Sequence, residues 1–172
     1  MTTGLFPGRF QPFHKAHLTD IKNALKEVDS LIILIGSAQY ANTPENPFSA
    51  EERKKMVADV LKAEKIRNCK IFALKDINDD SGWVDYVKNN LPRFDIVYSG
   101  NLRVINLFRE KNVPVKKIRL IKNISGTIIR EIILHKKEWT EKVPAKVAVA
   151  IRKIAGEKRI RESLKRSQLP FK

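Results

Sequence analysis

Short apolar runs alternate with amphipathic stretches along most of this chain, and this alternation restricts the folds that it can adopt. Five runs rich in β-branched and aromatic residues are predicted to be strands, at residues 4–6, 31–35, 70–74, 95–98 and 118–121. Helical patterns lie between them, at residues 17–28, from residue 49 onward, and at 83–91 and 102–110. Such alternation favours right-handed βαβ units and a parallel α/β sheet. A sheet of this kind binds ligands at the carboxyl ends of its strands, so a site is expected in the segments that follow them.

Local signals support two of these helices and one functional loop. In the first helix, apolar residues recur at helical spacing: Leu18, Ile21, Leu25 and Val28. Ser49 is expected to cap the second helix, with Glu52 completing a capping box. The connection over residues 36–48 is the longest in the chain, and loops of this length in compact domains tend to be functional.

Length and composition indicate one domain. The chain has 172 residues, of which 42% are hydrophobic, enough for one sizeable core. We expect the domain to occupy residues 1–143, with residues 144–172 as a basic helical extension of the same domain. The extension has an apolar stripe formed by Val147, Ile151, Ile154, Ile160 and Leu164.

The formal net charge of +15 would attract polyanions, including nucleotides and nucleic acid. Residues 152–172 contain eight Lys or Arg and two acidic residues. A solvated helix face explains this run, and contact with nucleic acid or a partner is the alternative. We favour the solvated face and expect no nucleic-acid partner.

The single cysteine, Cys69, excludes an internal disulfide, and without a CxxC or Cys/His cluster no structural zinc site is indicated. We expect Cys69 to be a buried strand residue. The first eight residues lack the features of a signal peptide, and no segment approaches the roughly 20 apolar residues of a membrane span. The sequence therefore predicts a soluble cytoplasmic protein with no membrane contact and no metal held by the protein itself.

The strongest motif is GRFQPFHKAH at residues 8–17, between the first strand and the first helix. It brings the cation of Arg9 and the imidazoles of His14 and His17 to a helix N-terminus. Free backbone N–H groups and the positive end of the helix dipole make such a place suitable for phosphate. Taken alone, the two histidines could equally be surface or capping residues, or zinc ligands.

A second candidate phosphate site is SGT at residues 125–127, which precedes an amphipathic helix, with Arg130 one turn later. Hydroxyls and backbone amides there can bind a phosphate, although an ordinary N-cap gives the same pattern. The presence of the first motif favours phosphate binding at both.

The first motif resembles the GRFQPFHxGH signature of the archaeal-type nicotinamide-mononucleotide (NMN) adenylyltransferases, members of the HxGH nucleotidyltransferase superfamily. Further blocks resemble that family in the same order: GSAQ at 36–39, NPFSAEER at 46–53, WV at 83–84, YSGN at 98–101, and ISGT at 124–127 with Arg130. Together they cover roughly residues 4–145.

The resemblance implies a Rossmann-like nucleotidyltransferase fold, with a five-stranded parallel sheet in the order 3-2-1-4-5, helices on both faces and a C-terminal helical extension. It implies transfer of the adenylyl group of ATP to NMN, giving NAD and pyrophosphate, with Mg²⁺ bound to ATP. It also implies a homo-oligomer, commonly a hexamer. Two alternatives are adenylyl or cytidylyl transfer to another phosphorylated acceptor, and a non-catalytic nucleotide- or RNA-binding module.

By resemblance, Arg9, His14, His17 and Arg130 would be catalytic. The expected ATP contacts are these four with Gly8, Phe10, Gly100, Asn101, Ser125 and Thr127. The expected NMN contacts are Ser37, Gln39, Phe48, Asp80 and Trp83. Trp83 could stack on the pyridinium ring as a cation–π pair, or could be a core residue. Arg53 fits either a phosphate contact or an exposed helical arginine.

Among the departures from the family pattern, two bear directly on substrate binding. Ala16 replaces the glycine of HxGH, and its methyl group is expected to crowd the adenine and weaken ATP binding modestly. Asp80 lies where relatives often carry asparagine, and a carboxylate there would favour the carboxamide of nicotinamide over the carboxylate of nicotinate.

Overall fold

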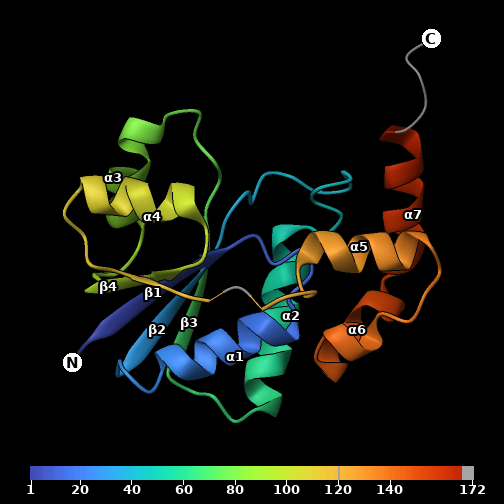
Figure 1. Cartoon of the computed structure of the whole chain (residues 1–172), viewed down its shortest axis with the longest axis horizontal. Coiled ribbons are helices and arrows are strands. Elements are labelled where there is room, and N and C mark those ends of the chain that lie inside the picture. Colours follow the sequence, from blue (N-terminus) through green and yellow to red (C-terminus); the bar gives the residue numbers. More distant parts are fainter. Residues whose placement is uncertain (120, 168–172) are drawn as a thin grey trace.

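A computed structural model describes residues 1–119 and 121–167, with side chains to residue 164 (Figure 1). Its sheet has five parallel strands in the order β3-β2-β1-β4-β5, which confirms the predicted topology. The strands are β1 (Thr3–Gly8), β2 (Ser30–Ile35), β3 (Cys69–Ala73), β4 (Ile96–Ser99) and β5 (Val115–Lys117). Cys69, predicted to be a buried strand residue, is the first residue of β3 and is only partly buried.

The fifth strand was predicted at residues 118–121, and this prediction is wrong. Strand β5 comes earlier, where Val115 pairs with Val97 and Lys117 with Ser99 of β4. Of the predicted run, Ile118, Arg119 and Ile121 lie after the strand, and Leu120 lies outside the described residues. The apolar side chains of Ile118 and Ile121, which suggested a strand, instead line cavities beside the sheet.

Helices cover both faces of the sheet, as predicted. They are α1 (Lys15–Ala24), α2 (Ala50–Ala63), α3 (Asp80–Asn90), α4 (Leu102–Glu110), α5 (Gly126–Leu134), α6 (Ala145–Lys153) and α7 (Gly156–Ser167), with a short 3₁₀ turn at Thr140–Lys142. Figure 1 shows α3 and α4 together on one side of the sheet, and α1, α2, α5 and α6 on the other.

Strand β2 has apolar side chains on both faces of the sheet, which explains why helices cover both faces. Because side chains alternate along a strand, Leu31, Ile33 and Ile35 enter the core beneath α1, α2 and α5. Ile32 and Leu34 enter a second core beneath α3 and α4. A strand buried on both faces has a continuous apolar sequence, which is the pattern seen at residues 31–35.

The first two helices begin at polar caps. Ser49 and Glu52 form the predicted capping box of α2. Helix α1 begins at Lys15, earlier than predicted, because His14 is its N-cap, and it ends at Ala24. Val28 is nevertheless buried in the core.

The C-terminal helices pack on the rest of the fold, α6 against α2 and α7 against α5. Arg159 of α7 donates to the Glu52 carboxylate at 2.7 Å and to the Pro47 carbonyl at 3.2 Å. Trp139 Nε1 donates to Glu157 at 2.6 Å. The last part of the predicted basic tail, residues 168–172, lies outside the described residues. None of the helices within residues 1–119 and 121–167 has the length and apolar character that a membrane span requires.

Candidate active site

A cleft of about 810 Å³ lies at the carboxyl ends of the strands. Its walls come from the segments that follow β1, β2, β3, β4 and β5, as expected for a parallel α/β sheet. It brings together most of the residues that the sequence singled out: Gly8, Arg9, Phe10, His14, His17, Ser37, Trp83, Gly100, Asn101, Ser125, Thr127 and Arg130.

The side chains of His14 and His17 form a stacked and hydrogen-bonded pair at the N-terminus of α1. Their rings stack with centroids 3.5 Å apart and planes 12° from parallel. The backbone N–H of His14 donates to Nδ1 of His17 at 3.3 Å, and that of His17 donates to Nδ1 of His14 at 3.4 Å. Since each Nδ1 accepts a hydrogen bond, each neutral ring carries its proton on Nε2.

Burial keeps both imidazoles neutral. It lowers the pKa of His14 to about 4. The pKa of His17 also lies well below 6.5, first because of burial and then because of the neighbouring His14. Phe10 packs edge-on against His17, with ring centroids 4.8 Å apart. Two uncharged rings therefore offer Nε2–H donors at a helix N-terminus.

The N-terminus of α5 faces the same cleft. Ser125 caps it by accepting from Ile128 N at 3.2 Å. Helix α5 approaches the first motif so closely that a Cβ at Gly126 would lie 2.7 Å from the Gln11 carbonyl oxygen. Only glycine allows this approach, which places the second predicted phosphate site beside the first.

Two arginines place positive charge between these helix ends. Arg130 is buried, with 8% of its surface exposed, and donates to the Gln11 carbonyl at 2.8 Å and to Thr127 Oγ1 at 3.3 Å. Burial lowers its pKa, and the positive charge of Arg9 lowers it further. Arg9 and Arg130 repel each other but line the same cleft, so both would attract an anion bound there.

Asn101 also lines the cleft. It caps α4 by accepting from Arg103 N at 2.9 Å, and its own N–H donates to Ser99 Oγ at 3.1 Å. Gly100 precedes it on the cleft wall, so the predicted adenosine contacts are close to the phosphate sites.

Trp83 of α3 lines the part of the cleft beside α3 and α4, which we call the α3–α4 arm. One side of its ring contacts Phe108 edge-on, with centroids 5.5 Å apart, while the residue also lines the cleft. Both sequence interpretations of Trp83, core residue and ligand contact, thus have a structural basis. Ser37 completes this arm and donates to Asp76 Oδ2 at 2.7 Å.

Three residues predicted to contact NMN do not line the cleft. Phe48 is fully buried in the core, where its backbone pairs with the Gln11 side chain at 2.9 and 3.0 Å. Gln39 is exposed and bonds the backbone of Asp76. Asp80 is also exposed and pairs with Arg103.

Arg53 is neither exposed nor aimed at the cleft. Its side chain is fully buried and donates to the carbonyls of Arg9 at 2.8 Å, Gly36 at 2.7 Å, Ser37 at 3.1 Å and Ser49 at 3.2 Å. Burial lowers its pKa to about 10. It ties the loops after β1 and β2 to α2, so its role is structural.

The sequence reasoning missed Asp76, Arg103 and Tyr40, which all line the cleft. Asp76 follows β3 by three residues, as the carboxyl-end rule would have indicated. Arg103 lies in the first turn of α4, directly after the YSGN block.

The cytidylyltransferase-like family pattern matches residues 5–132, and the fold agrees with it, so the protein is a nucleotidyltransferase of that family. Relatives named nicotinamide-nucleotide adenylyltransferase include one from Thermoplasma volcanium, 43% identical over 157 residues (90% of this chain, 88% of the relative). Another, from Methanococcus aeolicus, is 43% identical over 159 residues (91% of this chain, 92% of the relative). The chain belongs to the nicotinamide-nucleotide adenylyltransferase family.

A solved structure gives the same fold. It is a Francisella tularensis bifunctional NMN adenylyltransferase/ADP ribose pyrophosphatase complexed with AMP and a manganese ion. It superposes with a TM-score of 0.79 at 23% identity, over 99% of this chain. The chain spans 57% of the length of that protein.

Proposed function

We propose that this protein transfers the adenylyl group of ATP to NMN, forming NAD and pyrophosphate. The observation that carries the proposal is the convergence of two helix N-termini, those of α1 and α5, on one cleft that also contains Arg9 and Arg130. Helix ends with cations favour a polyphosphate. The named activity of the archaeal relatives supports the same reaction.

The reaction requires little from the protein besides positioning and charge. A phosphate oxygen of NMN, already anionic at neutral pH, attacks the α-phosphorus of ATP. A new P–O bond forms, the bond from the α-phosphorus to the bridging oxygen breaks, and pyrophosphate leaves with the electron pair. Holding two repelling anions in line and stabilising charge on the leaving group are the main tasks of such a site.

The described residues suit these tasks. In the proposed complex, His14 and His17 donate their Nε2–H groups to the ATP phosphates, as neutral donors whose geometry is fixed before the substrate binds. Arg9 and Arg130 supply the positive charge at the leaving group, with Ser125 and Thr127 beside them.

We propose that Mg²⁺ enters bound to the β- and γ-phosphates of ATP. Within the described part of the chain, no group of three His, Cys, Asp or Glu side chains could hold a metal ion, so the phosphate oxygens would be its main ligands. The manganese ion and AMP named for the Francisella tularensis structure support a divalent ion beside the nucleotide.

The arm that contains Trp83 suits the nicotinamide ring. Its indole can stack on the pyridinium cation, a contact worth about 0.5–2 kcal/mol. Asp76, rather than the predicted Asp80, is the carboxylate of this arm. It would accept from the carboxamide NH₂ and repel a carboxylate, so we propose that NMN is preferred to nicotinate mononucleotide.

Incubation with ATP, Mg²⁺ and a panel of phosphorylated acceptors tests the function. We expect dinucleotide and pyrophosphate in equal amounts with NMN, less product with nicotinate mononucleotide, and none with non-pyridine acceptors. A matched pair of variants checks that the site is responsible: His14→Asn should lose most activity, whereas Lys15→Gln, at an exposed neighbouring position, should retain it. Product formed with a non-pyridine acceptor alone would overturn the proposal.

The proposal also includes a cytoplasmic homo-oligomer, with the hexamer of similar proteins as the expected state. Light scattering coupled to gel filtration would measure the mass, and a monomer at all concentrations would contradict this part.

A further inference from the structure

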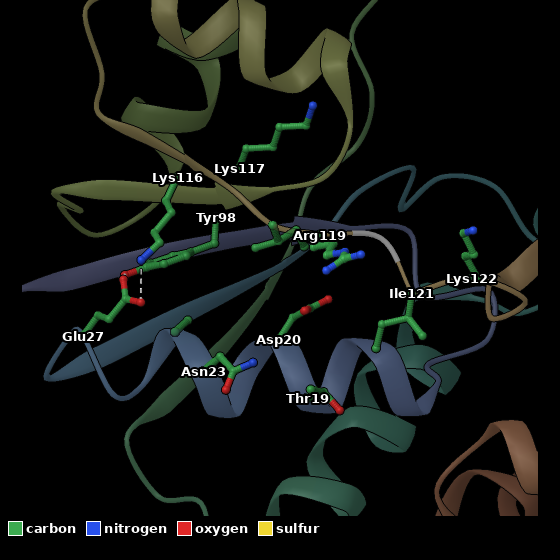
Figure 2. Close-up of a pocket in the computed structure, with 12 residues that line it drawn as sticks. Thr19, Asp20, Asn23, Glu27, Tyr98, Lys116, Lys117, Arg119, Ile121 and Lys122 are labelled. Atoms are coloured by element: carbon green, nitrogen blue, oxygen red, sulfur yellow. Dashed lines mark hydrogen bonds and ion pairs between the residues drawn. The ribbon is translucent and has the colours of Figure 1, made fainter.

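A carboxylate with no hydrogen-bond partner among the described residues, that of Asp20, lies where the cleft adjoins a second groove. The groove, of about 550 Å³, runs between α1 and the segment after β5 (Figure 2). Asp20, Ile118 and Ile121 line both spaces, so the two adjoin at these residues. Figure 2 shows the Asp20 side chain extending from α1 toward the segment that contains Arg119 and Ile121.

Asp20 is half-buried, and burial raises its pKa to about 6. Within residues 1–119 and 121–167, no hydrogen bond or ion pair reaches its carboxylate. The far end of the groove is different. There Glu27 accepts from Lys116 Nζ at 2.6 Å and from the Tyr98 hydroxyl at 3.1 Å, as the dashed lines in Figure 2 mark. Asp20 is thus an acceptor at the mouth of the cleft whose hydrogen-bonding capacity the fold leaves unused.

The surfaces around Asp20 suit a flat, apolar ring. Ala16 precedes it by one helical turn and is also on the cleft wall. Ile121 leaves 41% of its surface exposed, a large apolar side chain uncovered beside a polar cleft. Ile118 and Ile124 lie on the same wall. A ring covered by these side chains would present its edge to Asp20.

The following step depends on the proposed function. In the proposed reaction two nucleotides meet in this cleft, so each base needs its own part of it. Because Trp83 can stack on the pyridinium ring, we assign the α3–α4 arm to NMN. The purine of ATP would then lie in the part of the cleft between α1 and residues 118–124. A carboxylate accepts hydrogen bonds and does not donate them, so it suits the amine edge of adenine.

We propose that Asp20 is a specificity-determining residue that accepts a hydrogen bond from the exocyclic amine of the adenine ring of ATP. A hydrogen bond to a charged group contributes enough to change affinity by at least about tenfold.

Nucleotide binding without NMN tests this assignment independently of catalysis. The probes are ATP and purine riboside triphosphate, which lacks only the amine, titrated calorimetrically at a pH of about 8 so that Asp20 is ionised. We expect Asp20→Ala to weaken ATP binding about tenfold and to leave the analogue nearly unchanged. Asp20→Asn, which keeps one acceptor oxygen, should fall between. Asn23→Ala, at a position that lines only the outer groove, should change neither affinity.

Equal losses for the two nucleotides, or no loss for either, would overturn the assignment, because a structural or long-range charge effect does not distinguish the amine. The NAD assay is scored separately. If the wild type formed no NAD, the proposed function would be wrong. The role of Asp20 would still be supported if Asp20→Ala removed the preference for ATP over purine riboside triphosphate.

Discussion

Replacing the buried Arg53 with methionine should destabilise the protein strongly. Methionine retains much of the apolar length of the side chain and removes the donors. Two of the four carbonyls would keep another partner: Ser37 O accepts from Tyr40 N at 3.2 Å, and Ser49 O from the backbone N of residue 53 at 3.0 Å. For the carbonyls of Arg9 and Gly36, Arg53 is the donor at 2.8 and 2.7 Å.

The size of the effect follows from these two carbonyls. A buried acceptor left without a partner costs about 1–3 kcal/mol, and since these two hydrogen bonds are only part-buried we take the lower half of that range, roughly 2–4 kcal/mol for both. Removing a buried charge offsets part of this cost. We therefore expect the free energy of unfolding to fall by about 2 kcal/mol, which for a protein of this size lowers Tm by roughly 4–8 °C.

Urea unfolding followed by circular dichroism measures the loss, provided that the m-value stays constant. Arg53→Lys keeps the charge but not the planar fork, and should recover only part of the stability. Lys55→Met, on the exposed side of the same helix, is the control and should cost less than about 1 kcal/mol. A loss below about 1 kcal/mol for Arg53→Met would show that Arg53 does not hold the two loops.

Three further results are expected. His17→Ala should lower kcat by about 10²–10³, because it removes a preorganised donor to charge that develops in the transition state; unchanged kcat and KM in steady-state assays would refute that role. Ala16→Gly should tighten ATP binding a few-fold in calorimetry while costing up to about 1 kcal/mol of stability, and unchanged or weaker binding would refute the crowding by the buried methyl group. His14 has a folded pKa of about 4, below its unfolded value near 6.5, so its contribution to stability is present above pH 6.5 and is lost as the pH falls toward 4. His14→Asn should flatten the pH dependence of unfolding free energy in that range, and an unchanged slope would contradict the shift.

Four strands and the capping box of α2 could be predicted because local signals decide them. Residues 31–35 are apolar throughout, and Ser49 and Glu52 are spaced for a capping box. The fifth strand was misplaced because hydrophobicity does not reveal what covers an apolar side chain. Ile118 and Ile121 face cavities, whereas the lysines of β5 pair with β4 through their backbone.

Other errors arose from tertiary contacts that one sequence does not display. Arg53 follows Glu51 and Glu52, which suggested an exposed helical face, but the loops after β1 and β2 bring their carbonyls to it. Phe48 is held in the core by Gln11, which is 37 residues away in the sequence. The position of Asp76 after β3 could have indicated a cleft residue, but its pairing with Ser37 depends on the order of the strands.

The reciprocal hydrogen bonds between His14 and His17 have a consequence for how the two positions can vary. Each imidazole is held in one tautomer because its Nδ1 accepts the backbone N–H of the other residue. Substitution of either residue leaves its backbone N–H in place but removes the stacked ring, whose centroid is 3.5 Å away, so the remaining imidazole loses the contact that limits its rotation. The effects of the two substitutions should therefore not add, and the double variant should be little worse than either single one. A sequence that has lost one histidine of this pair gains little by keeping the second, so the two should be retained or lost together as the chain diverges.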